Sequence, residues 1–199
     1  YSSDSTLVFN AINRKVKNLK LKNTMLVRGF YNKSGEFVNK SMDFSNKNFI
    51  SINDLHEMTQ RLFYADNFKE KERFNLTDDQ LELVKKAMST VPSELKNLDP
   101  DEYSDNYVKF FSRRDEKTMT KDDDLEIYNK VGTAYGQLTE TALIISKNNT
   151  IILTATMTVN ENQYLNDDKY EYDSIGIPFF STLSREILNL ILTGIYEVN

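Results

Sequence analysis

Residues 126–159 restrict the possible folds of this chain more than any other part of the sequence. They begin with a strand-like run that contains Lys130-Val131-Gly132-Thr133, and Tyr135-Gly136 follows as a turn. Two runs rich in β-branched residues come next and are joined at Asn148-Asn149, because asparagine tolerates the positive φ angles of a tight turn. The stretch therefore predicts a strand followed by a β-hairpin.

Helices are predicted on both sides of this stretch. Ser51 and Asp54 predict a helix start, because a serine hydroxyl caps free amides and a carboxylate in the first turn favours the helix dipole. Thr77-Asp78-Asp79-Gln80 is a capping box that begins a second helix, which Pro92 ends. Pro178 marks the start of a terminal helix. The apolar faces expected on the first and last of these helices are Ile52, Leu55, Thr59, Leu62 and Phe63, and Phe179, Phe180, Leu183, Ile187, Leu190, Ile191 and Ile195.

The remaining segments carry weaker patterns. Across residues 7–37 the apolar positions are scattered among lysine and asparagine, which predicts short strands and loops. Aromatic residues at near-helical spacing predict a third helix over residues 101–111. The polar stretches 112–124 and 160–173 are interpreted as loops.

The composition favours a single domain over residues 1–199. A chain of 199 residues with 39% hydrophobic content can bury one sizeable core. The net charge of -5, without a basic patch, argues against a nucleic-acid partner. Cysteine is absent, which excludes disulfides and thiolate nucleophiles, and no apolar run is long enough for a membrane span. The chain does not begin with methionine, so we expect further residues upstream of Tyr1.

Several kinds of site are disfavoured by the residues. His56 is the only histidine, so neither a histidine-based triad nor a multi-histidine metal site can be built. The acidic segments 122–124 and 166–173 lack the alternating ligands and glycine of a calcium loop, and no metal or cofactor is expected. Ser93-Glu94-Leu95-Lys96 is the only Ser-x-x-Lys match, and about one is expected by chance in a chain of this composition.

The strand around Lys130 has two interpretations from its residues alone. In the first, Lys130 is an exposed edge residue beside a glycine that the sheet needs. In the second, a substrate lies along the edge strand, with Lys130 supplying positive charge and Gly132 allowing close approach to the backbone.

A resemblance to a known family bears on that choice. Lys130-Val131-Gly132-Thr133-Ala134-Tyr135-Gly136, followed by Leu138-Thr139-Glu140-Thr141-Ala142, resembles the Lys-Thr-Gly strand of the penicillin-recognising serine hydrolases, specifically the class A β-lactamase-like family. Further segments resemble exported serine hydrolases of that family from Bacteroidetes-type bacteria, and these are residues 42–49, 73–77, 88–94, 107–111 and 170–179.

The resemblance implies roles for the residues of this strand. In the family, an acyl-enzyme forms on the serine of Ser-x-x-Lys, and the Lys-Thr-Gly strand binds the carboxylate and carbonyl side of the substrate. Lys130 is then expected to be the catalytic electrostatic anchor, Gly132 the position of close approach, and Thr133 a source of a hydroxyl or of backbone contacts. Val131 replaces the hydroxyl residue of the motif, which removes one hydrogen bond to a carboxylate.

The chain order of the family implies that the nucleophile lies upstream. The Ser-x-x-Lys helix precedes all the segments that carry the likeness, so this chain resembles the C-terminal portion of a β-lactamase-like domain. Two further alignments stay open. Ser3-Asp4-Ser5 can be aligned with the Ser-Asp-Asn loop as a degenerate form of it. Glu36 can be aligned with the deacylating glutamate, although it lacks the surrounding Arg-x-Glu-Pro pattern.

The implied fold is an α/β architecture of the α+β sandwich type. It has an antiparallel sheet with the terminal helix on one face and the helices of residues 51–111 toward the other. The implied function is that of an exported, periplasmic or cell-envelope serine hydrolase that acts on an amide or ester such as a peptidoglycan peptide or β-lactam. The alternative is a non-catalytic pseudoenzyme, a binding module for a cell-wall or protein ligand.

Overall fold

The computed structural model describes residues 5–25, 48–99, 102–112, 125–146, 149–165 and 167–193. These residues fall into two compact units, which are divided in the sequence between Asn75 and Leu76. The prediction of a single domain over residues 1–199 stays a prediction.

The first unit begins with a helix that the sequence did not predict. It contains α1 (Ser5–Asn18), β1 (Thr24–Met25), β2 (Phe49–Ile50) and α2 (Ile52–Phe63), and β1 pairs antiparallel with β2. The expectation of only short strands and loops from residue 7 is therefore wrong. Ile12 and Val16 are one helical turn apart, and the lysine and asparagine residues between them obscure this spacing.

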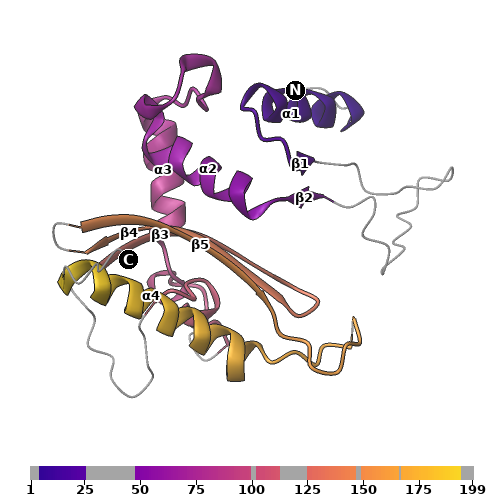
Figure 1. The fold of residues 1–199 in the computed structure, drawn as a ribbon, viewed down its shortest axis with the longest axis vertical. Helices are drawn as coiled ribbons and strands as arrows, with labels where there is room; N and C mark the ends of the chain where they lie inside the picture. Colours follow the sequence, from indigo (N-terminus) through magenta and orange to yellow (C-terminus); the bar gives the residue numbers. More distant parts are fainter. Residues whose placement is uncertain are drawn as a thin grey trace, which may run out of the picture. The chain divides into compact units, whose positions relative to one another are not determined.

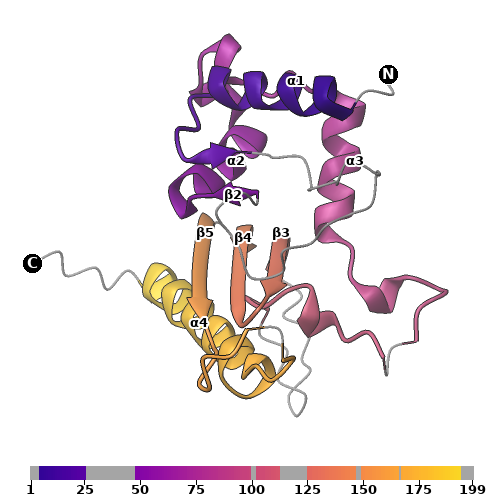
Figure 2. The same ribbon diagram turned by 90° about the vertical axis from the view of Figure 1, so that its right-hand side faces the viewer.

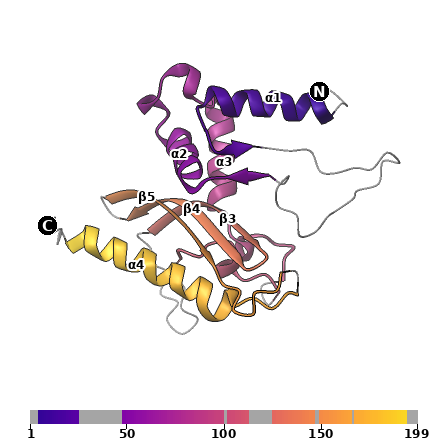
Figure 3. The same ribbon diagram turned by 45° about the vertical axis from the view of Figure 1, so that its right-hand side comes forward.

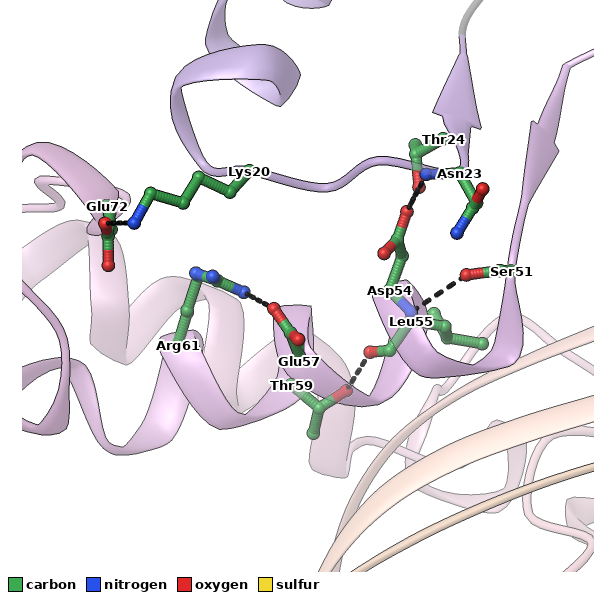
Figure 4. A network of polar contacts seen from close by, with 10 residues as sticks. All are labelled: Lys20, Asn23, Thr24, Ser51, Asp54, Leu55, Glu57, Thr59, Arg61 and Glu72. Atoms are coloured by element: carbon green, nitrogen blue, oxygen red, sulfur yellow. Dashed lines mark hydrogen bonds and ion pairs between the residues drawn. The ribbon is translucent and has the colours of Figure 1, made fainter.

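Polar contacts connect α2 to other segments of the first unit (Figure 4). The predicted cap is confirmed, because the Ser51 hydroxyl accepts from the Asp54 amide at 3.1 Å. The buried Asp54 carboxylate also accepts from the Asn23 amide at 2.7 Å and from the Thr24 hydroxyl at 2.8 Å. The predicted apolar face is only partly correct: Thr59 is buried, but Ile52 is 42% exposed. The Asp54 carboxylate thus links α2 to β1.

The second unit contains the three-stranded sheet that the sequence predicted. It consists of β3 (Leu125–Ala134), β4 (Gln137–Ser146) and β5 (Asn149–Thr158), in the order β3-β4-β5 with antiparallel pairing (Figure 2). Tyr135 and Gly136 form the turn between β3 and β4, with φ angles of 53° and 81°. The predicted strand and the pairing of the hairpin are confirmed. Of its predicted turn, Asn148 lies outside the described residues and Asn149 already belongs to β5.

Two longer helices accompany the sheet in this unit. α3 (Asp78–Ser89) begins with the predicted capping box, because the Gln80 amide donates to the Thr77 hydroxyl and the Thr77 amide donates to the Gln80 side chain. α3 contacts β3, and α4 (Ile177–Thr193) lies along the opposite face of the sheet (Figures 1 and 3). The predicted third helix is wrong. The described part of residues 101–111 forms only a 3₁₀ turn, Asp105–Tyr107.

The core of the second unit lies between α4 and the sheet. Phe180 of α4 stacks on Phe111 with ring centroids 5.3 Å apart and meets Phe110 edge-on at 5.8 Å. All three phenylalanines are fully buried. The remaining buried members of the cluster are Ile127, Leu138, Ala142, Ile144, Val159 and Leu188.

The terminal helix thus packs on the sheet as predicted, and Phe180 of the predicted face is buried, but the buried face is shifted from the predicted one. Phe179 and Leu190 of the predicted face are 51% and 48% exposed, and Ser184 is fully buried instead. A sheet of this kind with helices is an α+β fold, which confirms the predicted fold class.

Candidate functional site

Lys130 lies on an edge strand. Of the strands that the structure describes, β3 pairs only with β4, so one side of β3 presents unpaired backbone groups. The Lys130 side chain is exposed, and its ammonium group donates to the backbone oxygen of Val131. A positive charge is therefore available to solvent beside an open strand edge.

The register of the sheet separates the three predicted binding residues. Lys130 is opposite Thr141 and Gly132 is opposite Thr139, whereas Thr133 is opposite Leu138 of the core. Because side chains alternate along a strand, Lys130 and Gly132 share one face and the Thr133 side chain belongs to the other. On the face of Lys130, Thr133 can take part only through its backbone.

Gly132 leaves open space beside Lys130. A Cβ atom built at Gly132 meets nothing within 4 Å among the described residues. At Gly136 the same atom would lie 2.8 Å from the Asn160 Cβ, and φ is +81° there. The turn thus requires glycine at position 136, but no packing contact of the described residues requires it at position 132.

Threonine hydroxyl groups of β4 and β5 lie on the same face of the sheet as Lys130. The Thr141 and Thr154 hydroxyls are hydrogen-bonded at 2.8 Å, and so are those of Thr139 and Thr156. Both pairs lie in register with Lys130 or Gly132. Val131, by contrast, packs against the core cluster, so it adds no polar group to this face.

A buried polar network lies directly before Lys130 in the strand. The Lys109 ammonium donates to the Met88 and Ile127 carbonyl oxygens, each at 3.0 Å, and to the Asn129 Oδ1 at 2.7 Å. The Asn129 Nδ2 donates to the Val108 carbonyl oxygen at 2.7 Å and to the Glu140 Oε1 at 2.5 Å. Lys109, Asn129 and Glu140 are all buried, and each of their hydrogen-bonding groups named here has a partner.

Glu140 completes this network on β4. Its Oε2 accepts from the Phe111 amide at 2.7 Å, so both carboxylate oxygens face N–H donors. Burial raises the pKa of Glu140 to about 8, against the opposing effect of these donors and of the Lys109 ammonium. Lys109, Asn129 and Glu140 were not predicted as a group from the sequence. The available signal was a charged residue between the apolar inward-facing positions of Leu138 and Ala142.

The turn that follows residues 130–133 is held by hydrogen bonds as well. The Gly136 amide donates to the Tyr172 hydroxyl at 2.7 Å, and the Gly136 carbonyl oxygen accepts from the Val159 amide at 2.7 Å. Residues 130–133 therefore lie between two anchored points, Asn129 in β3 and Gly136 in the turn that follows this strand.

The weaker candidate sites fare differently. Ser93 lies in a 3₁₀ turn, Pro92–Glu94, and its hydroxyl donates to Asp105 at 2.8 Å, so Ser93 and Lys96 do not share the turn of α-helix that a Ser-x-x-Lys site needs. His56 is half-buried within α2. Ser3, Asp4, Glu36 and residues 122–124 lie outside the described residues. Within the described ranges, no three His, Asp or Glu side chains are grouped so that they could hold a metal ion.

None of the helices in the described part of the chain has both the length and the apolar composition of a bilayer-spanning segment. A family model described as the Beta-lactamase enzyme family matches residues 4–191. No curated protein matches the chain.

Proposed function

The chain belongs to the β-lactamase enzyme family, and from this premise we propose that it binds the substrate of a serine hydrolase along the open edge of β3. The substrate is an amide or ester, either a peptidoglycan peptide or a β-lactam, and it reacts through an acyl-enzyme. The observation that carries the proposal is the shared face of Lys130 and Gly132, with open space at Gly132 and polar groups on the neighbouring strands.

Each residue has a physical role in this proposal. The Lys130 ammonium attracts the substrate carboxylate, and a hydrogen bond to a charged group contributes about 1.5–3 kcal/mol. The open backbone edge adds hydrogen bonds to an extended, peptide-like ligand. The backbone of Thr133 belongs to this edge, and the missing side chain at Gly132 allows the ligand to approach the strand closely.

We place the nucleophile outside this chain. The family resemblance puts the Ser-x-x-Lys helix upstream, and the hydrogen bond from Ser93 to Asp105 argues against the one match within the chain. We also propose that the protein is exported to the periplasm or cell envelope, where a peptidoglycan substrate is found.

A second candidate is a binding module without catalysis. The observation that favours it is Val131, which stands where the family motif has a hydroxyl and which packs against the core. In this case the same edge of β3 holds a cell-wall or protein ligand without turnover.

One experiment separates the two candidates. The full-length gene product is incubated with a fluorescent penicillin and examined by gel electrophoresis and mass spectrometry. We expect a covalent adduct, and Lys130→Ala is expected to slow its formation roughly 10- to 100-fold, the rate equivalent of one charged hydrogen bond. Lys169→Ala, which removes an exposed lysine from a loop, is the matched control. The absence of any acyl-enzyme rejects the hydrolase and favours the binding module.

A further inference from the structure

We propose that Asn129 is a positioning residue, which Lys109 and Glu140 hold in place so that the backbone at residues 130–133 is fixed for ligand binding. This inference rests on the proposed function of β3. It gives a role to three buried polar residues that have no contact with a substrate in that proposal.

The position of Asn129 in the network supports this role. Asn129 directly precedes Lys130 in β3, and its side chain is on the core face while that of Lys130 is on the other. Through its amide group Asn129 connects β3 to the Val108 carbonyl oxygen and to Glu140 of β4. A shift of the Asn129 side chain is therefore expected to move the backbone of Lys130.

Lys109 and the Val108 carbonyl oxygen fix the orientation of the Asn129 side chain. Lys109 can only donate, so Oδ1, the only acceptor of the Asn129 side chain, must face Lys109, and Nδ2 then faces the Val108 carbonyl oxygen and Glu140. Reversing the amide group would place its N–H donors against the Lys109 ammonium and would leave the Val108 carbonyl oxygen facing another acceptor. The network therefore permits one orientation of the side chain.

The network also extends to the other elements of the second unit. Lys109 reaches the Met88 carbonyl oxygen of α3, and the Ser184 hydroxyl of α4 donates to the Phe111 carbonyl oxygen at 2.7 Å. The Phe111 amide in turn donates to Glu140. Hydrogen bonds thus connect Asn129, which directly precedes residues 130–133, to α3, β4 and α4 through neighbouring residues. A preorganised binding strand requires such support.

Amide hydrogen exchange in the 199-residue chain tests this role. Asn129→Ala removes the three side-chain hydrogen bonds, and the isosteric Asn129→Asp keeps only an acceptor for Lys109 and serves if the alanine variant fails to fold. The control is Ile127→Val, a buried substitution two residues earlier on the same strand and face that removes only packing.

A positioning role predicts a local effect. In the Asn129 variants, protection of the amides of residues 130–133 that pair with β4 is expected to fall about tenfold more than protection of the β5 amides, which corresponds to one lost hydrogen bond. In Ile127→Val, protection of both sets is expected to fall by the same factor. Equal losses in β3 and β5 in the Asn129 variants, or no loss at residues 130–133, overturn the proposal.

A second arm uses the fluorescent penicillin. If the full-length protein is labelled, Asn129→Asp is expected to slow labelling about tenfold more than Ile127→Val does, and equal rates overturn the positioning role. If the wild-type protein is not labelled at all, the proposed hydrolase function fails, while the exchange measurement still decides the role of Asn129.

Discussion

The buried carboxylate of Glu140 makes the stability of the protein depend on pH in a direction that can be measured. Burial raises the pKa of Glu140 from an ordinary value of 4.5 to about 8 in the folded protein. Between these two values the folded state binds a proton that the unfolded state has released. The contribution of Glu140 to stability is therefore complete below about pH 4.5 and is lost as the pH rises to about 8.

The size of this effect follows from the separation of the two pKa values. Each pH unit between them corresponds to about 1.4 kcal/mol, so the full loss is at most about 5 kcal/mol. Glu140→Gln removes the titration but keeps the shape of the side chain. It also places an amide NH₂ group against one of the two donors, the Phe111 amide or the Asn129 Nδ2, at a pH-independent cost of about 1–3 kcal/mol.

Urea unfolding of the wild type and of Glu140→Gln at several pH values isolates this contribution, because all other titrating groups are shared. We expect the stability of the variant relative to the wild type to rise by up to about 1.4 kcal/mol per pH unit between about pH 5 and pH 8, and to be constant above that. Glu161→Gln, at an exposed loop position, controls for the loss of a carboxylate. A relative stability that is flat or falls with pH would refute the reasoning, because it would mean that Lys109 and the two N–H donors outweigh burial.

Three further predictions concern single positions in the second unit. Phe180→Ala is expected to cost about 3–5 kcal/mol of unfolding free energy, because it removes a fully buried ring, while Phe179→Ala, at a half-exposed neighbour, should cost far less in the same urea titration. Gly136→Ala is expected to cost about 1–3 kcal/mol through its positive φ and the nearby Asn160 Cβ, and Gly132→Ala is expected to change stability by less than about 0.5 kcal/mol yet slow penicillin labelling of the full-length protein. Ser93→Ala is expected to leave that labelling unchanged, and a complete loss would identify Ser93 as the nucleophile.

The elements that could be predicted from the sequence are those whose signals are local. The turn at Tyr135-Gly136 and the caps at Ser51 and Thr77 depend on residues within a few positions of each other, and all three are present in the structure. The helix α1 was missed because the residues between Ile12 and Val16 conceal its period. The spacing of Phe110 and Phe111 from the preceding aromatic residues predicted a helix. Instead, both rings pack against Phe180, which lies far along the chain.

The residues of the candidate site also differ in whether they could be predicted from the sequence. Lys130 and Gly132 were found because they lie two residues apart on a predicted strand, in a segment that resembles a family motif. The network behind them joins residues 20 and 11 positions apart in the sequence, Lys109 with Asn129 and Asn129 with Glu140. Hydrogen bonds over such separations depend on how β3, β4 and the segment before them come together, and no local pattern encodes that arrangement.

The unpaired edge of β3 also affects how the protein behaves at high concentration. An edge that accepts an extended ligand can equally accept a strand from another molecule, which is the first step of edge-to-edge aggregation. An exposed lysine on such a strand opposes that pairing, because two copies would bring like charges together. Lys130 is therefore expected to oppose edge-to-edge association as well, and a ligand that neutralises its charge must cover the edge itself to prevent that association.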